Sequence, residues 1–184
     1  VDCITDFGLE FLDQVQKDKP FFLTISHIEP HHQNDRHCYE GPAGSKTRFQ
    51  DFVLPADLQA LPGNAAEMYP DYLGCCRSLD DNLGRVVDKL KAMGIWENTI
   101  LIFASDHGSH FMTRNRDAHL NGYDDYKRSC HDACLHVPLV ICGPGFEGGK
   151  RISELVSTAS LPKTILAMAS IDVGDQMIGE NLQT

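Results

Sequence analysis

The sequence lacks a long hydrophobic run. Its longest apolar stretches, such as residues 99–104 and 137–142, are only as long as strands, whereas a membrane-spanning helix needs roughly 20 apolar residues. It also lacks an excess of basic residues: it has 16 Lys and Arg but 26 Asp and Glu, which gives a formal net charge of −10. Such a chain has no positive field to neutralise a nucleic-acid backbone. We therefore expect neither a membrane span nor a nucleic-acid partner.

A regular cysteine pattern is also missing. The seven cysteines are odd in number and irregularly spaced, which is not typical of a disulfide framework. Cys130 and Cys134 lie four residues apart with His131 and His136 nearby, but the paired C-x-x-C spacing of closed zinc sites is absent. We expect buried free thiols, the usual state of cysteine in a core, and a zinc site is the alternative.

Helical and strand-like patterns alternate along the 184 residues, a length that suffices for one domain with its own core. The strand-like runs are apolar throughout, which is typical of strands buried on both faces. The alternation predicts an α/β fold with a mostly parallel sheet flanked by helices. Helices are expected at residues 6–17, 65–93 and 161–170, and strands at 21–26, 99–104, 137–142 and 154–157.

Polar clusters follow two of these strands directly. In parallel sheets, ligands bind beyond the carboxyl ends of the strands. Asp106 and His107 follow residues 99–104, and Gly108 permits a sharp turn there. Carboxylate and imidazole are both good metal ligands, so this turn is a candidate metal site. The alternative is a turn-capping aspartate beside an ordinary polar histidine.

Three histidines follow the first predicted strand, at His27, His31 and His32. Such a group can ligate a metal, bind an anion or transfer protons. Pro30 restricts the backbone beside His31 and so favours a fixed side chain. A solvated polar loop is the alternative for each histidine.

Two further charged pairs are candidates. Lys127 and Arg128 precede the strand at 137–142 and could bind an anionic group, although a basic pair is more often surface charge. Asp80 and Asp81 lie in the predicted long helix, where a solvated face explains them better than catalysis.

Taken in order, four segments resemble the sulfatases of the alkaline phosphatase superfamily. The resemblance runs over nearly the whole chain. Four such motifs in the family's order are fairly specific. They are Pro20–Leu23 continuing to Glu29-Pro30-His31, the helix ending at residues 94–99, Ser105-Asp106-His107-Gly108, and Lys127 to Pro138.

The resemblance implies an alkaline-phosphatase-like fold and assigns roles to particular residues. It implies that Asp106 and His107 bind a calcium ion, and that His31 and Lys127 contact the sulfate and carry the catalysis. His27 and His32 are further substrate-binding candidates. Calcium prefers oxygen ligands, so on chemistry alone Zn²⁺ or Mn²⁺ suits Asp plus His better.

The chain departs from the family pattern at the nucleophile. No cysteine begins the C-x-P-S-R or C-x-A-x-R pattern that yields formylglycine, and the family's N-terminal Asp pair has no counterpart. The sequence begins at Val1 rather than Met and shows no signal-peptide pattern, so we expect either a processed N-terminus or a fragment. We therefore expect residues 1–184 to form a single partial catalytic domain, with the formylglycine upstream, that is inactive alone and acts with its missing N-terminal part on a sulfated small molecule or carbohydrate.

Two other interpretations remain open. The parent could be a metal-dependent phosphodiesterase or phosphonate hydrolase of the same superfamily, or the chain could be a non-catalytic anion-binding fragment. Family analogy suggests a periplasmic, secreted or lysosomal protein.

Overall fold

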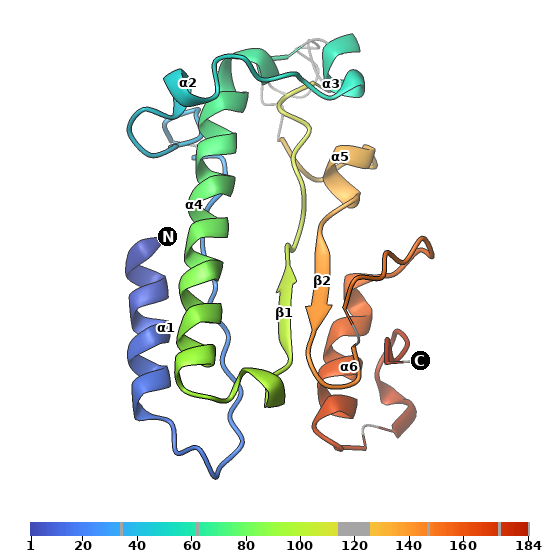
Figure 1. The fold of residues 1–184 in the computed structure, drawn as a ribbon. Helices are drawn as coiled ribbons and strands as arrows, with labels where there is room; N and C mark the ends of the chain where they lie inside the picture. The colour runs from blue at the N-terminus through green and yellow to red at the C-terminus, as the bar shows by residue number, and fades with distance from the viewer. Residues whose placement is uncertain (34, 62, 114–125, 147, 173, 184) are drawn as a thin grey trace. The chain divides into compact units, whose positions relative to one another are not determined.

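The structure is a computed structural model that describes residues 1–33, 35–61, 63–113, 126–146, 148–172 and 174–183 (Figure 1). The chain forms two compact units. The helical unit comprises Val1–Trp96 and His107–Val137, and the strand unit comprises Glu97–Asp106 and Pro138–Thr184.

The helical unit is built on α4 (Ala65–Ala92), which confirms the long predicted helix. Both α1 (Asp2–Gln14) and α2 (Ser45–Arg48) pack against α4 (Figure 1). Gly94 ends α4 with a left-handed φ of 71°, as expected of a C-terminal glycine. No helix in the described part of the chain is both long and apolar enough to cross a membrane. The unit's short helices are α3 (Ala56–Ala60) and α5 (Asp132–Leu135).

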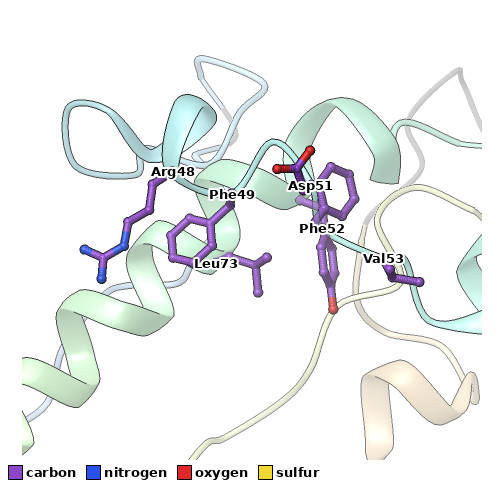
Figure 2. A pocket seen from close by; sticks show the side chains of 7 residues that line it. Arg48, Phe49, Asp51, Phe52, Val53 and Leu73 are labelled. Atoms are coloured by element: carbon purple, nitrogen blue, oxygen red, sulfur yellow. The ribbon is translucent and has the colours of Figure 1, made fainter.

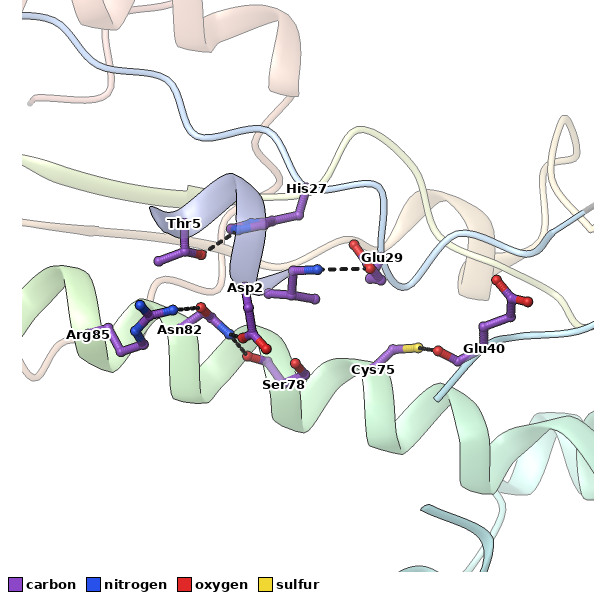
Figure 3. A network of polar contacts seen from close by, with 10 residues as sticks. Asp2, Thr5, His27, Glu29, Glu40, Cys75, Ser78, Asn82 and Arg85 are labelled. Atoms are coloured by element: carbon purple, nitrogen blue, oxygen red, sulfur yellow. Dashed lines mark hydrogen bonds and ion pairs between the residues drawn. The ribbon is translucent and has the colours of Figure 1, made fainter. Parts of the chain in front are cut away.

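Polar contacts fix α1 on α4 (Figure 3). Asn82 is 2% exposed, and its amide donates to the Asp2 carboxylate at 2.7 Å and to the Ser78 carbonyl at 2.9 Å. The Arg85 guanidinium donates to the Asn82 carbonyl at 2.9 Å and also pairs with Asp6. Because each polar group of the Asn82 amide has a partner, its burial carries no desolvation penalty from an unmade hydrogen bond.

The core of the helical unit lies where loops meet the N-terminal half of α4. Residues far apart in the sequence contribute to this core. Part of the segment before α4, for which the sequence predicts no regular structure, is therefore packed into it. Its buried members are Tyr39, Leu58, Ala65, Met68 and Phe111, with Leu54, Tyr69 and Tyr72 packed against them.

Residues 21–28 are extended but form no β-ladder among the described residues, so the predicted strand at 21–26 is wrong. From Phe21 to Ile28, half-buried and exposed side chains alternate, beginning with half-buried Phe21 and exposed Phe22. Such a period-two pattern is that of a strand with one face covered, whereas the continuous apolar run had suggested two covered faces. The run has β character, but a strand also needs a hydrogen-bonded neighbour.

The strand unit contains one antiparallel pair. β1 (Leu101–Ala104) pairs with β2 (Leu139–Cys142), with Leu101 opposite Cys142 and Ala104 opposite Leu139. Both strands lie within their predicted ranges. Their antiparallel pairing differs from the parallel arrangement expected, because hydrophobic pattern identifies strands and does not determine which neighbour they pair with.

The strand unit also contains α6 (Leu161–Met168), which confirms the last predicted helix. Thr164 is fully buried. Its hydroxyl donates to the Ser160 carbonyl at 2.7 Å and accepts from the Leu182 amide at 3.1 Å. No strand forms at residues 154–157, where Leu155 is fully exposed, so that prediction is wrong. Short 3₁₀ turns occur at Trp96–Asn98, Thr158–Ser160 and Gly174–Gln176.

Candidate functional site

Three of the predicted site residues meet within the helical unit, around the Lys127 ammonium. Lys127 Nζ lies 3.2 Å from His107 Nε2 and 3.4 Å from His31 Nε2. An ammonium only donates, so an imidazole nitrogen that hydrogen-bonds to it must use its lone pair. One cation therefore lies between two histidines that are far from each other in the sequence.

His31 is held in this position by a tyrosine. The Tyr126 hydroxyl lies 2.7 Å from His31 Nε2, and the two rings meet edge to face with centroids 5.6 Å apart. Burial lowers the pKa of His31, and the nearby Lys127 and His107 lower it further. A neutral imidazole with its lone pair on Nε2 can accept a hydrogen bond from the Tyr126 hydroxyl, whereas the other tautomer would donate to it.

His107 is oriented by the backbone around it. His107 Nδ1 lies 2.9 Å from the carbonyl oxygen of the next residue, Gly108. A carbonyl only accepts, so Nδ1 carries the proton. The unprotonated Nε2 is then directed at Lys127. The Gly108 amide donates to Cys134 O and the Ser109 amide to Ala133 O, both at 2.9 Å. This backbone pairing holds the turn after Asp106 against the segment that carries Lys127.

Gly108 is required for that close approach. A Cβ at this position would lie 2.0 Å from Ala133 O, and backbone atoms cannot move aside cheaply. We expect Gly108→Ala to lower the free energy of unfolding by about 1–3 kcal/mol, the usual cost of overpacking. Urea unfolding followed by circular dichroism measures this change.

Gly84→Ala is the matched control for this substitution. Gly84 lies inside α4, and a Cβ there meets no atom of the described residues within 4 Å. Because alanine is the better helix former, Gly84→Ala should raise the free energy of unfolding by about 0.5–1 kcal/mol. Equal stability for the two variants would show that the 107–109 turn is not tightly packed.

The other two histidines lie in different surroundings. His27 Nε2 lies 2.9 Å from the Thr5 hydroxyl of α1 (Figure 3), and burial lowers its pKa. His32 is 2% exposed, and its ring packs against Tyr126 at 4.9 Å and Tyr39 at 5.3 Å. The structure therefore brings His31, His107 and Lys127 together, packs His32 against Tyr126, and joins His27 to Thr5 of α1.

Asp106 is exposed and is the last residue of its segment in the strand unit, while His107 begins the next segment of the helical unit. A peptide bond joins these two predicted metal ligands. Among the described residues, no group of three or more His, Cys, Asp or Glu side chains could hold a metal ion. These residues thus supply at most part of a metal site.

The four residues of the alternative zinc site do not gather. Cys134 is buried and donates to the Tyr126 carbonyl at 3.5 Å, whereas Cys130 is exposed. His131 Nδ1 lies 2.9 Å from the Ser129 hydroxyl, and His136 pairs with Asp132. All seven cysteines are free thiols, as expected, but only Cys75 and Cys134 are buried, so the expected burial is wrong for the other five.

An open hollow of about 380 Å³ lies near α2 and the first half of α4 (Figure 2). None of the predicted site residues lines it, so it is separate from the histidine–lysine group. Its lining consists of Arg48, Phe49, Asp51, Phe52, Val53, Tyr69 and Leu73.

Tyr126 is a member of the site that the sequence did not reveal. It is 3% exposed and contacts His31, His32 and Lys127. Its position directly before Lys127 could have indicated a role in the site. A single aromatic residue in a polar segment, however, usually belongs to the hydrophobic core. Only the contact with His31, 95 residues away, distinguishes it.

The arrangement suits an anion. An ammonium has three donors, so an oxyanion can bind Lys127 alongside the imidazoles. Half-burial of Lys127 and of both histidines strengthens such a charge-assisted contact relative to one in open water. A tetrahedral oxyanion that accepts from the remaining ammonium donor of Lys127 is the simplest ligand for this geometry.

Comparison with known proteins identifies the family. The Sulfatase family model matches residues 2–171. Arylsulfatase K of Bos taurus is 32% identical over 111 residues, covering 60% of this chain and 19% of the relative. Arylsulfatase K of Rattus norvegicus is 30% identical over 208 residues, covering 97% of this chain and 36% of the relative.

A solved structure shares the fold. The crystal structure of the "putative sulfatase yidJ" from Bacteroides fragilis aligns with a TM-score of 0.79 at 20% identity, covering 98% of this chain and 39% of that one. The fold is thus the alkaline-phosphatase-like α/β fold of sulfatases, present in part. The chain spans well under half the length of these relatives. The chain belongs to the sulfatase family.

Proposed function

We propose that residues 1–184 form a single partial sulfatase catalytic domain, which hydrolyses sulfate esters only together with a missing N-terminal part. That part supplies the formylglycine nucleophile, so this chain alone is inactive. The substrate is a sulfated small molecule or carbohydrate. His31 and Lys127 contact the sulfate in this proposal, with His27 and His32 as weaker candidates.

The observation that carries the proposal is the position of Lys127 Nζ, 3.2 Å from His107 Nε2 and 3.4 Å from His31 Nε2. A fixed ammonium stabilises negative charge that develops on the sulfuryl oxygens during transfer. Burial and the nearby Lys127 and His107 lower the pKa of His31, which favours its role as a proton acceptor at the unprotonated ring nitrogen.

The proposed metal ligands fit a cation only in part. Asp106 contributes a carboxylate, but His107 Nε2 is directed at the Lys127 ammonium, so a metal bound at that nitrogen requires Lys127 to turn away. The family resemblance favours Ca²⁺ as the bound metal, whereas an imidazole ligand suits Zn²⁺ or Mn²⁺ better. A bound metal supplies Lewis-acid stabilisation of the sulfuryl oxygens.

Anion binding and turnover by the purified chain test this proposal. We expect isothermal titration to show binding of sulfate, and an aryl sulfate assay to show no turnover. Lys127→Met should weaken sulfate binding about tenfold or more, because one charge-assisted hydrogen bond contributes about 1.5–3 kcal/mol. Lys46→Met, which removes an exposed ammonium paired with Asp71, should leave binding unchanged.

Other outcomes separate the alternatives. Turnover by this chain alone refutes the missing-nucleophile proposal. Binding of phosphate in clear preference to sulfate favours a phosphoester or phosphonate hydrolase. No response to sulfate, phosphate, Ca²⁺ or Zn²⁺ favours a non-catalytic fragment.

A further inference from the structure

We infer that Tyr126 is the positioning residue of the anion site: it orients His31 and Lys127 before the anion binds. The inference rests on the proposed function and deepens it. It begins from the Tyr126 hydroxyl, which lies 2.7 Å from His31 Nε2, the same nitrogen that faces Lys127.

The tyrosine contacts both anion-binding side chains at once. Its ring meets the His31 ring edge to face at an interplanar angle of 88°, and Lys127 Nζ lies 5.2 Å from the ring centroid. A cation at that distance from an aromatic ring is attracted by the ring's quadrupole. Lysine has a flexible stem that costs entropy to immobilise, so holding it in advance raises the affinity for an anion.

Tyr126 is itself firmly held. It is 3% exposed, and its ring packs on His32 with centroids 4.9 Å apart. Its carbonyl accepts the His110 amide at 2.8 Å and the Cys134 thiol at 3.5 Å. A residue fixed through ring and backbone can impose its geometry on its neighbours, which is what positioning by supporting contacts requires.

The inference also predicts which His31 nitrogen carries the proton. With Tyr126 as the donor to Nε2, the His31 proton lies on Nδ1. Nitrogen-15 NMR of the histidine side chains measures this tautomer in the unsubstituted protein. The Nε2–H tautomer at His31 overturns the inference without any variant.

Tyr126→Phe is the decisive variant, because it keeps the ring and removes only the hydroxyl. We expect the His31 nitrogen-15 signals to shift and sulfate affinity to fall about two- to tenfold, in line with loss of one hydrogen bond. Tyr39→Phe is the matched control: Tyr39 is also 3% exposed, and its hydroxyl lies 2.5 Å from Ser109. It should leave the His31 signals and sulfate affinity unchanged.

The two readouts distinguish the possible failures. If Tyr126→Phe alters neither the His31 signals nor sulfate affinity, Tyr126 is only a core residue and the inference is wrong, while the proposed function stands. If the unsubstituted protein binds no sulfate, the proposed function fails, and the His31 signals alone decide whether Tyr126 positions that ring.

Discussion

Lys127→Met in the full-length sulfatase that we propose should lower kcat/KM for an aryl sulfate about a hundredfold to a thousandfold. Methionine keeps an unbranched, flexible side chain and removes the charge. Removing one preorganised donor that stabilises developing negative charge typically has an effect of this size. The size is plausible here because Lys127 is half-buried between His31 and His107, where solvent screens its charge less than at the surface.

Lys46→Met again serves as the control, because Lys46 is an exposed lysine of the same unit. Lys127→Arg separates charge from geometry. Arginine restores the charge but is wider and planar, so it should recover only part of the lost activity. A kcat/KM for Lys127→Met within twofold of the unsubstituted enzyme would contradict the assignment of Lys127 to the sulfate.

The second large effect is expected on metal binding. Asp106→Ala in the same full-length protein should weaken metal affinity about a hundredfold or more, since even residues that only support metal ligands contribute 10–100-fold. Mass-spectrometric metal analysis after dialysis measures the loss, and activity after chelation and addition of Ca²⁺, Zn²⁺ or Mn²⁺ identifies the ion.

Asp80→Ala provides the comparison, because Asp80 is an exposed carboxylate on α4. It should retain both metal and activity, which also tests the interpretation of that carboxylate as a solvated face. His107→Ala extends the test. If this variant loses activity but retains the metal, His107 contributes to anion binding by holding Lys127. His107 is then not a metal ligand.

The elements that could be predicted are those whose evidence is local. The apolar stripe of α4 repeats over many turns, and β1 and β2 are short apolar runs with clear boundaries. Residues 21–26 have the same apolar character as β1, yet form no strand here, because a strand is defined by its neighbour as well as by its own side chains.

The site was partly predictable for a similar reason. His31, His107 and Lys127 are chemically distinctive and match family motifs. The role of Tyr126 depends on a contact across 95 residues, and nothing local indicates it. His27 shows the converse: its sequence neighbourhood resembles that of His31, but the structure directs its ring to Thr5 on α1.

The separation of Lys127 from His31, 96 positions along the chain, has a consequence for folding. Contacts between such distant residues require closure of a long loop and therefore form late, after local helices such as α4. The anion site cannot exist in a partly folded chain that has only its helices. Under the proposed function, sulfate affinity reports complete folding of the helical unit, and sulfate added during refolding should shift the equilibrium toward the native state by mass action.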